Sequence, residues 1–302
     1  MQMGMIGLGK MGANMTTRLL AGGHTIVVSD LSAAAVEKAG SGGAVPTTGL
    51  ADLVGKLKAP RAVWVMVPSG DPTEQTVWKL RDLLSVGDIV IDGGNSNYKD
   101  SMRRAEMLKQ KGINFVDVGT SGGVWGLANG YSMMIGGDKK IVESLRPIFE
   151  TLAPAPDLGW GYVGPNGAGH YAKMIHNGIE YGMMQAFAEG FAILKAKSEF
   201  NMELAEVARI WQHGSVVRSW LLDLLAEALA HDEKLEDIAA FVPDSGEGRW
   251  TVAEAIDLNV SAPIIMLSLE RRIRSRESDP YADKLLSVLR NQFGGHAIKK
   301  QE

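Results

Sequence analysis

The stretch MGMIGLGKMG, residues 3–12, decides the fold class that the sequence predicts. It opens with a short apolar run, Met3–Ile6, that is typical of a buried strand. Its glycines then follow at the spacing G-x-G-x-x-G, just before a helical pattern. Glycines in this context allow a tight turn and bring a helix N-terminus close to a pyrophosphate. An ordinary strand–helix turn is the alternative interpretation. The residues predicted to contact a dinucleotide here are Gly7, Leu8, Gly9, Lys10, Met11 and Gly12.

Short apolar runs and helical patterns alternate through the first half of the chain. Strands are predicted at Met3–Ile6, Thr25–Ser29, Ala62–Val67, Asp88–Ile91, Asn114–Val118 and Ser132–Ile135. Helices are predicted at Gly12–Ala21, Ala33–Ala39, Thr73–Leu84, Tyr98–Lys111 and Lys139–Phe149. This alternation is typical of a parallel, doubly wound sheet with helices on both faces.

The strand signals stop after PAPDLGWGYVGPNG, residues 154–167, and only helical patterns follow. We therefore predict an α/β chain of two domains. A Rossmann-type dinucleotide-binding domain is expected over residues 1–164. An all-α substrate and oligomerisation domain is expected over residues 165–302.

The composition limits the possible function classes. A net charge of −4 at pH 7 provides no general positive field for nucleic acid. The absence of cysteine excludes disulfides, thiolate nucleophiles and thiolate metal sites. No basic leader precedes the first apolar run, and no apolar run reaches the roughly 18 residues of a membrane span. We expect a soluble, cytoplasmic protein that binds neither nucleic acid nor membrane.

Asp30, at the end of the second predicted strand, bears on the choice of cofactor. A carboxylate at this point accepts hydrogen bonds from the adenosine ribose hydroxyls and repels a 2′-phosphate. Leu31 follows, so no arginine stands beside Asp30 to receive that phosphate. The sequence therefore predicts NAD as the cofactor. Lys38 or a shift of the backbone is the feature that would allow NADP instead.

Polar residues recur at positions i, i+3, i+4 and i+7 of a predicted helix in KMIHNGIEYG, residues 173–182. They are Lys173, His176, Asn177 and Glu180. The apolar residues that follow predict that this helix is largely buried. A polar stripe on a buried helix is either a satisfied structural network or a reaction site. A lysine acts as a general base only if its pKa falls well below about 10.4, and burial has that effect.

Three glycine-containing loops follow predicted strands: MVPSG at residues 66–70, IDGGNSNY at 91–98 and VGTSGGVWG at 118–126. Ligands of open α/β sheets bind outside the carboxyl ends of the strands, so these loops are predicted to line the nicotinamide end of the cleft. The side chains of Asn95 and Ser121 offer neutral hydrogen-bonding groups. Two successive glycine amides in the third loop form an anion-binding nest. Turns that need positive φ are the alternative interpretation. The cofactor contacts predicted from these loops are Val67, Pro68 and Asn95.

The motifs IDGGNSNY, SGGVWG, KMIHNGIEYG, GEGRWT and RNQFGGH occur in the same order in the decarboxylating 6-phosphogluconate dehydrogenases. The chain resembles that family over nearly its whole length. The wider β-hydroxyacid dehydrogenase superfamily shares the N-terminal glycines, the S-G-G loop and the helix lysine. The resemblance implies oxidation and decarboxylation of 6-phospho-D-gluconate to D-ribulose 5-phosphate and CO2. The β-keto acid formed on the way loses CO2 readily, so no metal is expected, and the sequence has no HExxH motif.

The resemblance also implies roles for individual residues. Lys173 matches the base that takes the proton of the C3 hydroxyl, and Glu180 matches the acid that protonates C1 of the enediol once CO2 has departed. The matching substrate contacts are Asn95, Ser121, Gly122, Gly123, His176 and Asn177, and the matching positions around the substrate phosphate are Tyr181, Arg249, Thr251 and Arg272. Arg290 and His296 match tail residues that the family inserts into the active site of a neighbouring subunit.

Some features depart from the family pattern. Arg249 stands where lysine is usual, which keeps the charge and changes the donor geometry from a point to a fork. Asp30 and Leu31 replace the Asn–Arg pair of NADP-using members, which supports NAD. The chain is also shorter than the long-form members. Short members usually assemble as dimers or tetramers, so a homo-oligomer is expected.

Two rival functions follow from the same residues. Another β-hydroxyacid dehydrogenase, acting on 3-hydroxyisobutyrate or a tartronate-like acid, would oxidise its substrate without decarboxylation. A small unphosphorylated acid has no use for Arg249, Arg272 and Arg290 together. A non-catalytic dinucleotide-sensing module is the other rival, and it would keep its response to NAD without Lys173.

Overall fold

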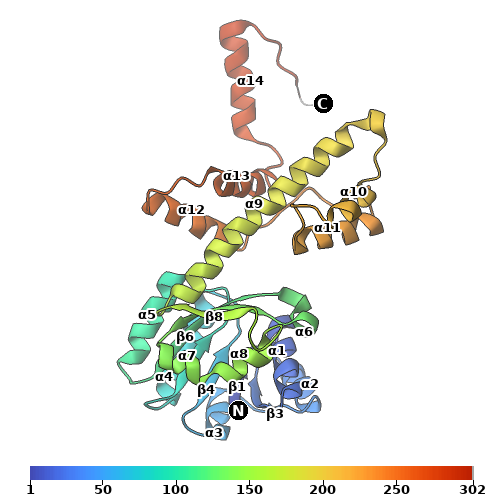
Figure 1. Cartoon of the computed structure of the whole chain (residues 1–302). Helices are drawn as coiled ribbons and strands as arrows, with labels where there is room; N and C mark the ends of the chain where they lie inside the picture. Colours follow the sequence, from blue (N-terminus) through green and yellow to red (C-terminus); the bar gives the residue numbers. More distant parts are fainter. Residues whose placement is uncertain (301–302) are drawn as a thin grey trace. The chain divides into compact units, whose positions relative to one another are not determined.

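The computed structural model describes residues 1–300, except for the side chain of Phe293. The chain forms two compact units that divide between Asn177 and Gly178. This division falls inside α9, the long helix Ala168–Ala196 (Figure 1). The domain boundary at residue 164 stays a prediction, because a division inside one continuous helix does not decide where a domain begins.

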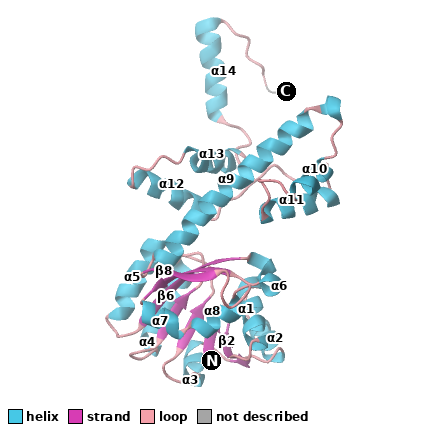
Figure 2. Cartoon of the chain, in the orientation of Figure 1, coloured by secondary structure: helices cyan, strands magenta, loops and turns pink. Residues whose placement is uncertain are grey.

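The first unit is built on a β-sheet (Figure 2). The sheet has eight strands in the order β3-β2-β1-β4-β5-β6-β7-β8. The strands are β1 Gln2–Ile6, β2 Thr25–Ser29, β3 Val45–Pro46, β4 Ala62–Val65, β5 Ile89–Asp92, β6 Asn114–Ser121, β7 Ser132–Gly137 and β8 Trp160–Gly164. Strands β1 to β6 are parallel to one another, which confirms the predicted doubly wound sheet. The strand order reverses between β1 and β4, which is where dinucleotides bind in such sheets.

The sheet is mostly parallel, as predicted, and the exception is β7, which runs antiparallel to β6. Only the short helices η1 (Gly123–Trp125) and α6 (Gly126–Asn129) lie between these two strands. A parallel pair needs a crossover of a dozen or more residues, and this connection is too short for one. The sequence patterns also miss β3 and β8, because β3 has two residues and β8 carries glycines beside the exposed Tyr162 and Val163.

Helices cover both faces of the sheet in the first unit. They are α1 Lys10–Ala21, α2 Ala33–Ser41, α3 Leu50–Lys56, α4 Asp71–Leu83, α5 Tyr98–Lys109, α7 Lys139–Ser144 and α8 Arg146–Leu152. One buried core joins Met15 of α1 to Met5 of β1, and a second joins Leu80 of α4 to Ile6 of the same strand. Alternate residues of one strand enter different cores, as expected where both faces of a sheet are covered.

The described part of the second unit contains only helices and loops, which confirms the all-α prediction. After α9 come η2 Ser198–Phe200, α10 Leu204–Trp211, α11 Trp220–His231, α12 Glu247–Asp257, α13 Pro263–Arg274 and α14 Tyr281–Gly294. A small core joins Phe191 of α9 to Leu204 of α10 and Leu222 of α11.

The prediction that α9 is largely buried is wrong for its second half. Ile179 is 53% exposed and Ile193 is 70% exposed, and Met183 and Met184 are also exposed. The buried core of this unit includes Phe191 of α9, but these four apolar side chains stay exposed within the described chain. Within residues 1–300, no helix combines the length and the apolar composition needed to cross a membrane.

Candidate active site

The glycine turn lies between β1 and α1. Gly7 has a φ of +92°, and a side chain at Gly12 would collide with the carbonyl oxygen of Gly7. Gly9 differs from both, because no atom of the described residues beyond its chain neighbours lies within 4 Å of the position that its Cβ would take. Gly9 is the N-cap of α1, and no side chain caps this end of the helix. The start of α1 therefore lacks a side-chain cap, and Gly9 and Lys10 line a cavity, which fits a pyrophosphate at the helix N-terminus.

Asp30 lies directly after β2 and is fixed by backbone amides. Its Oδ2 accepts a hydrogen bond from the amide of Leu8 at 2.6 Å, and its Oδ1 accepts one from the amide of Ser32 at 2.7 Å. Because Leu8 belongs to the glycine turn, the carboxylate is held beside the predicted pyrophosphate site. Each oxygen keeps a lone pair for a ribose hydroxyl. The next side chain, Leu31, is fully exposed.

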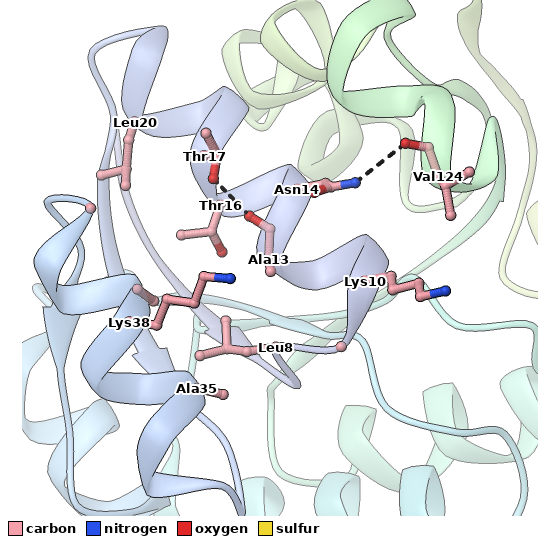
Figure 3. A pocket seen from close by; sticks show the side chains of 13 residues that line it. Leu8, Lys10, Ala13, Asn14, Thr16, Thr17, Leu20, Ala35, Lys38 and Val124 are labelled. Carbon is pink, nitrogen blue, oxygen red and sulfur yellow. Dashed lines mark hydrogen bonds between the residues drawn. The ribbon is translucent and has the colours of Figure 1, made fainter.

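A cavity of about 660 Å³ begins at the glycine turn and continues between α1 and α2 (Figure 3). Leu8, Gly9 and Lys10 line one end of it. Lys38 points from α2 toward α1 and lines the same cavity. Lys38 is the residue that the NADP alternative invokes, so it belongs in any test of cofactor choice.

The loops that follow β4, β5 and β6 meet at one edge of the sheet, because these strands are parallel. They hold the predicted residues Val67, Pro68, Asn95, Gly122 and Gly123, and the predicted Ser121 is the last residue of β6. Both glycines have positive φ, +131° and +51°, so the turn itself requires them. Asn14 of α1 donates a hydrogen bond to the carbonyl of Val124 at 3.4 Å (Figure 3). The S-G-G loop is thereby tied to the helix that begins at the glycine turn.

The start of α9 is anchored on the sheet by a residue that sequence reasoning missed. Asp117 of β6 is fully buried, and its carboxylate accepts hydrogen bonds from the amides of Gly167 at 2.7 Å and His170 at 3.0 Å. Gly119 of β6 lies so close to α9 that a side chain there would collide with Cβ of Lys173. These contacts place Lys173 against the carboxyl end of β6. The sequence feature that could have identified Asp117 was its carboxylate, which stands alone inside the apolar run of β6.

Lys173 and its two neighbours on α9 form a chain of polar contacts. The Lys173 residue is 7% exposed, and its Nζ lies 3.4 Å from Nδ1 of His176. The same Nδ1 lies 3.1 Å from Oδ1 of Asn177. A protonated Nδ1 donates to Asn177, whereas an unprotonated Nδ1 accepts from the Lys173 ammonium. The tautomer of His176 is therefore linked to the proton on Lys173. Glu180 follows on α9, in the second unit, and is half-buried.

The second unit brings together residues that were predicted around the substrate phosphate. The guanidinium of Arg272 lies over the ring of Tyr181, 3.5 Å from its centroid, and donates a hydrogen bond to the carbonyl of Pro243 at 3.1 Å. The hydroxyl of Tyr181 is buried and has no hydrogen-bond partner among the described residues. Thr251 is buried, and its hydroxyl donates to the carbonyl of Glu247 at 2.8 Å.

Asp244 holds a second arginine next to this group. Arg249 donates two hydrogen bonds to its carboxylate at 2.8 and 3.0 Å, and Arg276 lies 3.0 Å from the same carboxylate. The hydrogen bonds from Arg249, and to a smaller extent the contact with Arg276, lower the pKa of Asp244. Asp244 therefore stays ionised at neutral pH. One carboxylate thus balances only part of the positive charge of Arg249, Arg272 and Arg276, which suits an anionic ligand.

The last two predicted residues lie apart from this group. Arg290 is an exposed residue of α14, and His296 is an exposed residue beyond it. Within residues 1–300, no hydrogen bond or ion pair links either side chain to Arg249, Arg272 or Tyr181. Their roles stay predictions.

The strand order, the uncapped glycine turn and Asp30 define the class of the protein: a dinucleotide-binding α/β domain, here followed by a helical unit with a cationic cluster. The particular family follows from comparison with known sequences. Residues 2–164 match the NAD binding domain of 6-phosphogluconate dehydrogenase, and residues 169–300 match the C-terminal domain of the same enzyme. The chain belongs to the 6-phosphogluconate dehydrogenase family, which confirms the resemblance found in its motifs.

Two relatives agree with this assignment over their full length. The Bacillus subtilis protein YqeC, provisionally named a 6-phosphogluconate dehydrogenase, is 45% identical over 301 residues, and the match covers all of both chains. An NAD(+)-dependent, decarboxylating 6-phosphogluconate dehydrogenase of Haloferax volcanii is 42% identical over 303 residues, again covering all of both chains. Among solved structures, 6-phosphogluconate dehydrogenase of Plasmodium falciparum superimposes with a TM-score of 0.85 at 29% identity. That match covers 100% of this chain and 67% of the Plasmodium chain, which was solved with NADP+ and with 6-phosphogluconate.

Proposed function

We propose that the protein is an NAD-dependent, decarboxylating 6-phosphogluconate dehydrogenase. The observation that carries this proposal is the placement of Lys173. It is a buried lysine, fixed against the carboxyl end of β6 in the same unit as the glycine turn and Asp30. A buried amine beside a dinucleotide site is suited to removing the proton of a hydroxyl as that carbon is oxidised.

The residues of this chain divide the chemistry among them. NAD, when bound, accepts a hydride from C3 of the sugar acid. Lys173 takes the proton of the C3 hydroxyl, and the resulting β-keto acid loses CO2 because its carbonyl accepts the electron pair of the broken C1–C2 bond. Glu180 then delivers a proton to the carbon that CO2 has left. His176 and Asn177 orient substrate hydroxyls, while Asn95, Ser121 and the amides of Gly122 and Gly123 contact the carboxylate end.

The substrate phosphate is assigned to the second unit. Arg249 and Arg272 supply charge, and the unpartnered hydroxyl of Tyr181 supplies a donor. Thr251 is also buried in the second unit, where its side chain packs next to Gly178 of α9. A small unphosphorylated hydroxy acid has no second anionic group for these arginines, whose positive charge Asp244 balances only in part, so we favour a phosphorylated substrate over a 3-hydroxyisobutyrate-like acid.

A steady-state assay with 6-phosphogluconate tests the proposed function directly. We expect NADH and CO2 to form in equal amounts, with a higher kcat/KM for NAD than for NADP. Formation of NADH without CO2, or a preference for 3-hydroxyisobutyrate, would support the rival dehydrogenase. If 6-phosphogluconate reduces neither cofactor, the proposal is wrong.

Replacing Arg272 by alanine tests the phosphate site. We expect KM for 6-phosphogluconate to rise by ~10- to 100-fold with little change in kcat, because a hydrogen bond to a charged group contributes about 1.5–3 kcal/mol. Activity with unphosphorylated gluconate, measured in the same assay, should not change. Arg209→Ala is the matched control, since Arg209 pairs with Glu206 on the exposed surface of α10. An equal loss with gluconate would contradict the assignment.

We further propose that the protein forms a homodimer or homotetramer. The exposed apolar side chains of α9 and the exposed Leu285, Leu286 and Leu289 of α14 support this, because large exposed apolar surfaces mark interaction sites. In such an assembly Arg290 and His296 would reach the active site of a neighbouring subunit. A cytoplasmic location stays a prediction.

A further inference from the structure

A buried arginine of the first unit links two of the loops at the edge of the sheet. Arg104 of α5 is 1% exposed, and its partner Asp92, the last residue of β5, is 0% exposed. Arg104 donates to Oδ2 of Asp92 at 3.2 Å and to Oγ of Ser96 at 3.3 Å. Its Nε donates to Oε2 of Glu74, on α4, at 2.8 Å. Arg104 therefore bridges two helices and a loop through charged bonds in a dry environment.

On one side, this network fixes the loop that carries Asn95. Oδ1 of Asp92 accepts a hydrogen bond from the amide of Gly94 at 3.2 Å, and Oδ2 accepts one from the hydroxyl of Ser96 at 2.8 Å. Asn95 thus stands between two residues that are both bonded to Asp92. Its side chain points outward, as its exposure shows, while its flanking residues are buried.

On the other side, the network reaches the loop that carries Val67 and Pro68. Glu74 lies in the first turn of α4, next to Thr73, whose hydroxyl donates to the carbonyl of Pro68 at 2.8 Å. The hydrogen bonds from Arg103 lower the pKa of Glu74 to about 2, so it is ionised at any working pH. The two loops also touch, since a Cβ on Gly94 would lie 3.2 Å from the carbonyl oxygen of Val67.

We propose that Arg104 is a positioning residue that holds these two loops in register, so that Asn95 meets the substrate and nicotinamide at a fixed distance from Val67 and Pro68. This inference rests on the proposed function of Asn95. A guanidinium suits the task because its rigid fork binds two carboxylates at once, whereas an ammonium is a point charge. Asp92, left without Arg104, would be a buried carboxylate with one hydroxyl and one amide as its partners, and the loop would move to hydrate it.

The test compares Arg104→Met with the neighbouring Arg103→Met. Both arginines bond to Glu74, but Arg103 is about half exposed and touches neither Asp92 nor Ser96. We expect Arg104→Met to lower kcat/KM for 6-phosphogluconate by ~10-fold or more, Arg104→Lys to recover part of the loss, and Arg103→Met to leave kcat/KM within about twofold. Amide exchange of residues 93–97 should accelerate only in the Arg104 variants.

A double-mutant cycle with Asn95→Ala separates positioning from general destabilisation. If Arg104 acts through Asn95, Arg104→Met should reduce kcat/KM much less in the Asn95→Ala background, because the loss is not additive for coupled residues. Additive losses, or unchanged amide exchange, would overturn the proposal. Should Arg104→Met fail to fold, Ser96→Ala removes one bond from the same network and should show the same coupling on a smaller scale. A wild-type enzyme inactive on 6-phosphogluconate would instead count against the proposed function, while the exchange result would still judge the network.

Discussion

Lys173→Ala is expected to lower kcat for 6-phosphogluconate by ~10²- to 10⁴-fold, the range that a positioned general base contributes. The physical reason is that no other amine is fixed at this place on β6, among the described residues, to receive the hydroxyl proton. Affinity for NAD, measured by fluorescence titration, should change little, because the dinucleotide contacts come from the glycine turn and Asp30. Steady-state kinetics with saturating NAD give kcat directly.

Two further variants make this result specific. Lys140→Ala removes an exposed lysine of α7 and should leave kcat unchanged. Lys173→Arg keeps the positive charge next to His176 but cannot release a proton at neutral pH, so it should be nearly as inactive as the alanine variant. A Lys173→Ala protein that retains wild-type turnover would contradict the role of the lysine. The dinucleotide-sensing alternative would be supported if the wild-type protein binds NAD without turnover and the Lys173→Ala variant binds NAD equally well.

The fold of the first unit could be predicted because the signals for its strands and turns lie within short stretches of the sequence. Buried parallel strands appear as continuous apolar runs such as that of β1, and the glycine spacing after it specifies the turn. The direction of β7 could not be predicted from the composition of the strand, because it depends on the length of the connection that precedes it. The exposure of Ile179 and Ile193 could not be predicted for a different reason. An apolar pattern indicates which residues favour burial, but it does not show whether another element covers them.

The candidate site shows the same limit. Lys173, His176 and Asn177 share one helix, so helical spacing was enough to group them. Asp117 and Arg104 act on residues far away in the chain, as in the bonds from Gly167 to Asp117 and from Arg104 to Glu74. Their sequence signal was a charged side chain within a pattern that predicts burial. That signal indicates a partner without telling which residue it is.

Asp30→Asn combined with Leu31→Arg is expected to shift the ratio of kcat/KM for NADP to that for NAD by ~10²- to 10³-fold toward NADP. Removing the carboxylate ends its repulsion of a 2′-phosphate, and each charged hydrogen bond gained contributes about 1.5–3 kcal/mol. Leu31 is a suitable position for the new arginine because it is fully exposed and follows the residue that faces the ribose. The ratio is measured by steady-state assays with each cofactor at saturating 6-phosphogluconate.

The single variants and Lys38 decide how that shift arises. Asp30→Asn keeps a carbonyl oxygen that can accept from the amide of Leu8, now bonded at 2.6 Å, so the glycine turn should retain its shape and NAD activity should fall only moderately. Lys38 lines the cavity that begins at this turn. If wild-type activity with NADP depends on it, Lys38→Ala should abolish that activity and leave kcat/KM for NAD unchanged. If the double variant keeps the wild-type ratio, Asp30 does not select the cofactor, and the selection must lie in contacts that Lys38 or the backbone of the β2–α2 turn provides.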